Sequence, residues 1–161
     1  MSMPFNADEV FEMAEQIERN GGEFYRSAAK KFPEVNEILL ELAAMEDEHL
    51  KTFANMRSEL SGTELEEPVY DPDDQVQMYL RVMADGHVFD VKTDQAEKLA
   101  EKNKPEDVLK MAIGLESDSI AFYVGLKEAV PSKAGKNKVG DIIKQEMGHI
   151  VILSQKLKDL K

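Results

Sequence analysis

The sequence contains no cysteine in its 161 residues. This absence excludes disulfide bonds, iron–sulfur clusters, zinc sites with cysteine ligands and catalytic thiols. Proline and glycine are also scarce, with 6 and 9 residues, and no alternation of apolar and polar residues persists along the chain. A chain of this length is typical of one domain with a full core. We therefore predict an all-α protein with a single domain over residues 1–161.

A net positive charge and long apolar runs are lacking as well. The formal net charge is −12, which argues against nucleic acid or an anionic membrane surface as a partner. No apolar run approaches the roughly 20 residues that a bilayer-spanning helix needs, and the N-terminal segment MSMPFNADEV does not follow the pattern of a signal peptide. We predict a soluble cytoplasmic protein without nucleic-acid or membrane partners.

Four long segments repeat apolar residues at steps of three and four, which is the spacing of one helix face. Asn6 is the predicted N-cap of the first helix, and Pro105 suits the first position of the third. A short turn after Phe32 would make the first two helices antiparallel neighbours. The predicted helices span residues 7–31, 35–60, 105–130 and 139–161, and the segment PSKAGKNKVG is interpreted as the second turn.

Residues 62–104 connect the two helix pairs, and a structureless loop of this length would be unusual in a compact domain. Apolar spacing predicts a helix over residues 73–85 that ends at Gly86, and a second short helix over residues 93–102. His87 lies on the same predicted face as the apolar residues of the first of these helices, and we interpret it as a structural residue. We predict that this segment is a partly helical crossover along the bundle.

Each of the four apolar stripes carries polar residues at its centre. A buried charge without a partner costs several kcal/mol, so these residues need a compensating group. Two Glu-x-x-His motifs combined with two further inward glutamates form the ligand set of di-iron and di-manganese carboxylate bundles. We predict that six side chains bind two metal ions: Glu18, Glu46, His49, Glu116, Glu146 and His149.

The two helix pairs resemble each other, because a Phe-Tyr pair follows the first glutamate of each at the same distance. This internal duplication supports a site with approximate two-fold symmetry. Glu46 and Glu146 are predicted to bridge the ions, with Glu18 and His49 completing one position and Glu116 and His149 the other. Tyr25 and Tyr123 are predicted to orient carboxylates by hydrogen bonds, and the alternative is core packing alone.

Small residues stand at matching positions of the two halves, Gly21 and Ser119. We expect them to leave a pocket beside the metals for dioxygen or peroxide. Met45 and Met147 flank the two motifs, and we interpret them as core-filling residues.

On these motifs the chain resembles the rubrerythrin-like branch of the ferritin-like superfamily. The resemblance implies a ferritin-like four-helix bundle around a non-haem di-iron centre that reacts with hydrogen peroxide or dioxygen, in a homodimer. Rubrerythrins carry an additional glutamate where this chain has Ser119, and their rubredoxin domain needs cysteines that are absent here. Electrons would therefore come from a separate donor protein. The motifs are Glu18…Phe24-Tyr25, Glu46-x-x-His49, Glu116…Phe122-Tyr123 and Glu146-x-x-His149.

Three functions are compatible with this pattern. The leading hypothesis is a di-iron oxidoreductase, peroxidase-like or ferroxidase-like, that reduces hydrogen peroxide or dioxygen. The second is a ferritin-type ferroxidase that stores iron in a shell of many subunits. The third is a non-catalytic bundle stabilised by metal. Two iron ions are the predicted cofactors, and manganese and zinc also accept carboxylate and imidazole ligands.

Overall fold

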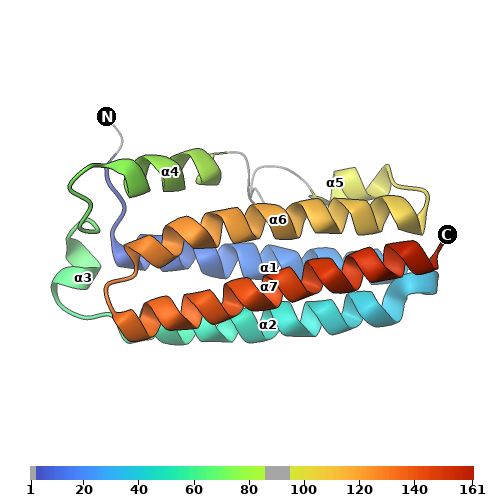
Figure 1. Ribbon diagram of the computed structural model, residues 1–161, viewed down its shortest axis with the longest axis horizontal. Helices are drawn as coiled ribbons and strands as arrows, with labels where there is room; N and C mark the ends of the chain where they lie inside the picture. The colour runs from blue at the N-terminus through green and yellow to red at the C-terminus, as the bar shows by residue number, and fades with distance from the viewer. Residues whose placement is uncertain (1–2, 86–94) are drawn as a thin grey trace.

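The computed structural model describes residues 3–85 and 95–161. Four long helices lie side by side along the long axis of the molecule (Figure 1). No strand occurs within these described ranges, so the all-α prediction is confirmed. The bundle helices are α1 (Ala7–Lys31), α2 (Asn36–Ser58), α6 (Pro105–Ala129) and α7 (Lys133–Asp159).

The helix ends follow local capping chemistry. Asn6 and Glu9 form a capping box, in which the Glu9 amide donates to the Asn6 side chain at 2.8 Å and the Asn6 amide donates to Glu9 at 2.9 Å. A short 3₁₀ helix, η1 (Pro33–Val35), makes the tight connection between α1 and α2. Pro105 is the first residue of α6, as predicted.

Helix α7 begins at Lys133, six residues before the predicted start, so the prediction of a long turn here was wrong. Ser132 caps the helix, because its hydroxyl accepts the Gly135 amide at 3.0 Å. Gly135 does not interrupt the helix. A Cβ at this position would lie 2.6 Å from the Cγ1 atom of Val130, so the glycine allows close packing.

The crossover is partly helical, as predicted, and contains α3 (Thr63–Glu66), α4 (Gln75–Ala84) and α5 (Gln95–Ala100). Figure 1 shows α4 along the outer side of α6, whereas α5 contacts α1, where the Lys31 side chain donates to the Leu99 and Ala100 carbonyls at 2.8 Å. Leu80 of α4 is fully buried, and the Tyr79 hydroxyl donates to the backbone carbonyl of Ala121. Gly86 and His87 lie outside the described residues, as do the first residues of the predicted helix at 93–102.

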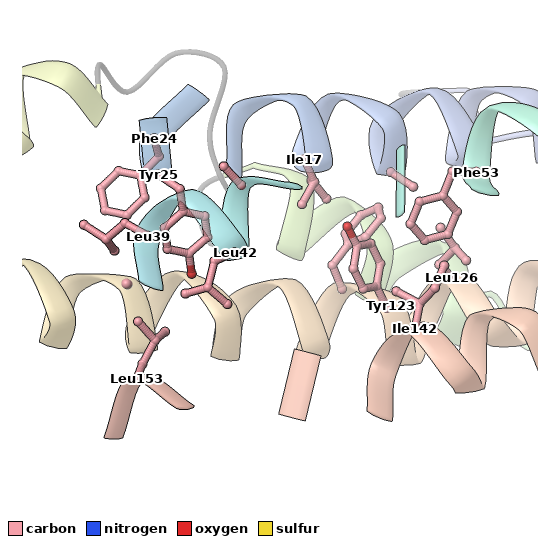
Figure 2. Close-up of a cluster of buried hydrophobic side chains, with 14 of the residues drawn as sticks. Ile17, Phe24, Tyr25, Leu39, Leu42, Phe53, Tyr123, Leu126, Ile142 and Leu153 are labelled. Carbon is pink, nitrogen blue, oxygen red and sulfur yellow. The ribbon is translucent and has the colours of Figure 1, made fainter. Parts of the chain in front are cut away.

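The apolar core fills the space between the four bundle helices. Figure 2 shows Tyr25 near Phe24 and Leu42, and it shows Tyr123 at a different level along the bundle, near Phe53. The rings of Phe53 and Tyr123 have centroids 5.2 Å apart. Among the described residues, no helix combines the length and apolar character needed to cross a membrane.

Candidate metal centre

The structure brings all six predicted ligands together in the middle of the bundle. Each of these residues is at most 2% exposed. Their side chains form two overlapping groups, and within each group the potential ligand atoms lie within 4.8 Å of one another. Glu46 and Glu146 belong to both groups. The first group adds Glu18 and His49, and the second adds Glu116 and His149.

Both imidazole rings direct Nδ1 toward carboxylates. Nδ1 of His49 lies 3.1 Å from Glu146 Oε1 and 3.5 Å from Glu18 Oε2. Nδ1 of His149 lies 2.9 Å from Glu146 Oε2 and 3.2 Å from Glu46 Oε1. The rings are stacked, with centroids 5.5 Å apart. One nitrogen of each histidine therefore faces the oxygen-rich centre of its own group.

The two tyrosines connect the helix pairs crosswise. The hydroxyl of Tyr25 on α1 donates to Oε1 of Glu116 on α6. In the same way, the hydroxyl of Tyr123 on α6 donates to Oε1 of Glu18 on α1. Both tyrosines thus bind a carboxylate oxygen in addition to packing in the core. The matching geometry gives the site approximate two-fold symmetry.

Several buried polar atoms of this cluster lack a hydrogen-bond partner in the described structure. A buried polar atom left unsatisfied costs about 1–3 kcal/mol, so a concentration of them calls for a missing partner. A cation would supply that partner, and oxygen and imidazole nitrogen donors suit iron and manganese. The residues therefore fit a two-metal centre. The atoms are Oε2 of Glu18, Oε1 of Glu46, Oε2 of Glu116, Oε2 of Glu146, and both ring nitrogens of His149.

Burial and mutual repulsion determine how the carboxylates titrate without metal. Burial, supported by the charges of neighbouring glutamates, raises the pKa values of Glu18 and Glu116 well above the ordinary value of 4.5. Burial opposes ionisation of Glu146 too, but the two histidines, whose Nδ1 atoms lie 3.1 and 2.9 Å from its oxygens, outweigh burial and lower that pKa. The metal-free cluster therefore retains protons on some carboxylates while Glu146 stays ionised.

The pKa values of both histidines are raised, whereas burial usually lowers the pKa of an imidazole. Burial alone would lower the pKa of His149, but the nearby carboxylates of Glu116, Glu146 and Glu46 raise it to about 12. The pKa of His49 is also raised, chiefly by Glu146 against the effect of burial. Without metal, protons on the imidazoles thus compensate part of the carboxylate charge.

The expected pocket at Gly21 is not found, because the Glu46 carboxylate occupies the space beside this residue. A Cβ at Gly21 would lie 2.9 Å from Glu46 Oε2. The matching residue, Ser119, is buried and its hydroxyl donates to the Leu115 carbonyl at 3.0 Å. The small residue at position 21 therefore makes room for a carboxylate.

The interpretation of two methionines as core-filling residues was wrong. Met45 is 40% exposed and Met147 is 53% exposed, because each directly neighbours an inward glutamate and so lies on the outer side of its helix.

Sequence reasoning missed one contact with the cluster. The side-chain oxygen of Gln145 lies 2.9 Å from Nε2 of His49. Gln145 directly precedes the Glu146-x-x-His149 motif, but it contacts the histidine of the other motif, on a different helix. No spacing within one helix could have indicated this pair.

Comparison with known proteins identifies the family to which the chain belongs. The family model described as a ferritin-like domain matches residues 6–159, and the chain belongs to this family. A protein from Thermotoga maritima, whose crystal structure is described as that of a candidate ferritin-like diiron-carboxylate protein, superposes with a TM-score of 0.77. The two sequences are 24% identical, and the match covers 100% of both chains. No curated protein matches the sequence. The predicted ferritin-like bundle is confirmed.

Proposed function

We propose that this protein binds two iron ions in the buried cluster and acts there as an oxidoreductase that reduces hydrogen peroxide or dioxygen. The observation that carries the proposal is the pair of overlapping ligand groups, with unpartnered oxygens aimed at a shared centre. The description of the Thermotoga maritima protein as a diiron-carboxylate protein supports the choice of metal. Electrons would come from a separate donor protein.

The contacts suggest a role for each carboxylate. Glu46 and Glu146 belong to both groups, which suits them to bridge two ions. The Oε1 atoms of Glu18 and Glu116 each accept a hydrogen bond from a tyrosine hydroxyl. Their other oxygen, Oε2, has no hydrogen-bond partner among the described residues. Each is therefore suited to bind one ion through Oε2, beside His49 in the first group and His149 in the second.

The tyrosines would hold these two carboxylates in place. Burial raises the pKa values of Tyr25 and Tyr123 well above the ordinary value of 10.0, and the adjacent Glu116 and Glu18 add to the effect. Both hydroxyls therefore stay protonated and keep donating to the glutamates. Hydrogen bonds of this kind orient metal ligands and commonly affect metal affinity by 10- to 100-fold.

The core around the cluster would exclude bulk water from the reaction. When bound, two ferrous ions would together supply the two electrons that, with two protons, convert hydrogen peroxide to two water molecules. The protein would contribute ligands whose protons leave on metal binding, since burial raises the pKa values of Glu18 and Glu116 and so disfavours their ionised forms without metal.

The test is elemental analysis of the purified protein, followed by anaerobic loading with Fe(II) and absorbance spectra after addition of peroxide. We expect two iron ions per chain and a rapid change of the near-ultraviolet absorbance. A protein that binds two ions without reacting would instead be a metal-stabilised bundle. Failure to bind any ion would refute the proposed metal centre itself.

Light scattering of the same sample tests the assembly. The proposed oxidoreductase is expected to be a homodimer. A hollow shell of many subunits would instead favour ferroxidase activity coupled to iron storage.

A further inference from the structure

The two histidines of the cluster differ at the ring nitrogen that faces away from the carboxylates. Nε2 of His49 lies 2.9 Å from the side-chain oxygen of Gln145. Nε2 of His149 is buried and has no hydrogen-bond partner in the described part of the chain. At Nδ1 both rings face Glu146 and further carboxylates, which are Glu18 for His49 and both Glu46 and Glu116 for His149.

One sequence difference accounts for this inequality. Gln145 directly precedes Glu146 on α7 and reaches across to the histidine of α2. The residue that directly precedes Glu46 on α2, and so holds the matching position, is Met45. A methionine offers only a weakly accepting sulfur, whereas a glutamine offers a carbonyl oxygen. The duplicated halves therefore share the proposed ligands but not this neighbouring contact.

The contact favours Nε2 as the position of the His49 ring proton when Nδ1 gives up its own proton to a cation. A histidine nitrogen binds a metal through its lone pair, so the ring proton must then sit on the other nitrogen. The Gln145 oxygen can only accept a hydrogen bond, and it therefore holds a proton on Nε2 of His49. Nδ1, which faces Glu18 and Glu146, is left to bind a cation. His149 lacks a partner that would select this tautomer.

We propose that Gln145 is a positioning residue for His49 and makes the two metal positions unequal. The first cation binds beside Glu18 and His49, and the second binds more weakly beside Glu116 and His149. This inference rests on the proposed function, namely that the cluster is a two-metal centre. It adds an order of binding that the symmetric ligand set does not predict.

The test is an anaerobic titration of the metal-free protein with Co(II), followed by calorimetry and by the visible spectrum of bound cobalt. The wild type is expected to bind two ions in two steps. Gln145→Met copies the residue of the other half, and it should weaken the first step by about 10- to 100-fold, so that the steps merge. Gln145→Glu keeps an accepting oxygen and should preserve the two steps.

Two further variants separate positioning from a general effect on folding. Met45→Gln offers His149 an amide oxygen and should strengthen only the second step. Gln155→Met makes the same change at an exposed position of α7, where the Gln155 amide donates to Asp159 at 2.9 Å, and should alter neither step. Thermal unfolding of the metal-free variants should match that of the wild type.

The outcomes distinguish this inference from the proposed function. Two cobalt ions bound with equal affinity by the wild type, or two unchanged steps in Gln145→Met, would overturn the inference alone. Equal weakening of both steps in Gln145→Met would also overturn it, because the residue would then act on the whole site. A wild type that binds no cobalt would overturn the proposed metal centre, and this inference with it.

Discussion

The helix pairs α1–α2 and α6–α7 carry the same proposed ligands and the same tyrosine, yet neither pair forms a closed site. Tyr25 of the first pair donates to Glu116 of the second, and Tyr123 of the second donates to Glu18 of the first. The histidines also cross over, since Nδ1 of His49 contacts Glu146. The centre therefore exists only where the halves meet.

The halves differ in the residues around the ligands. Gly21 leaves room for the Glu46 carboxylate, whereas its counterpart Ser119 bonds to its own helix backbone. Gln145 contacts His49, whereas its counterpart Met45 is partly exposed on the outer side of α2. The duplicated ligands of the two halves thus have different neighbouring residues. Four experiments test how far the equivalence of the halves extends.

The largest effect is expected when a shared ligand is removed. Glu146→Ala should abolish tight binding of both ions, because Glu146 belongs to both ligand groups. Glu18→Ala should remove binding at one position only. Elemental analysis after anaerobic Fe(II) loading measures both. Glu41→Ala, an exposed position of α2, is the matched control and should keep two ions. Two ions bound by Glu146→Ala would contradict the bridging role.

The stability of the metal-free protein should depend on pH through Glu18 and Glu116, which hold equivalent positions in the two halves. The folded-state pKa values of Glu18 and Glu116 are raised above 4.5, so the folded state binds more protons than the unfolded state above that pH. Stability should therefore be greatest below about pH 4.5 for these two groups and fall as pH rises toward their folded-state pKa values.

Urea unfolding of the metal-free protein between pH 5 and 8, in roughly half-unit steps, measures this decline. Glu18→Gln and Glu116→Gln mimic the protonated forms. Each variant should therefore lose a similar part of the decline in stability with rising pH. A decline that neither variant changes would show that other groups cause it. Bound metal should also reduce the decline, because the cation replaces the protons.

Loss of a crosswise hydrogen bond should have a moderate effect. Tyr25→Phe and Tyr123→Phe each leave a buried glutamate oxygen without its donor, which should lower the free energy of unfolding by about 1–3 kcal/mol. Chemical denaturation of the metal-free proteins measures the difference. Tyr70, which is 89% exposed, provides the control variant Tyr70→Phe. A large effect from only one of the buried tyrosines would show that the two halves are not equivalent at this contact.

The smallest effect is expected at Ser119. Its hydroxyl donates to a carbonyl of its own helix, so Ser119→Ala should lower the free energy of unfolding by about 0.5–1.5 kcal/mol and leave metal binding intact. Gly21→Ala should be more damaging to metal binding, because the new methyl group would displace the Glu46 carboxylate. Equal iron content in the two variants would argue against the different roles of these matching positions.

The amino-acid sequence by itself determined the helices and the residues that face inward, because both depend on spacing along one chain. Helical periodicity placed Glu18, Glu46 and Glu116 on buried faces, and Asn6 and Pro105 marked two helix starts. The start of α7 was misplaced, because the segment PSKAGKNKVG was interpreted as a turn. Ser132 caps that helix and Gly135 packs closely within it.

Only the tertiary structure decided which side chains meet across the bundle. The pairs Tyr25–Glu116, Tyr123–Glu18 and Gln145–His49 each join different helices, and the residues lie 91, 105 and 96 positions apart. Such contacts depend on the rotation and axial offset of whole helices, which the packing of the entire core sets. Periodicity fixes the direction of a side chain relative to its own helix axis, but the partner it reaches depends on where the other helix lies.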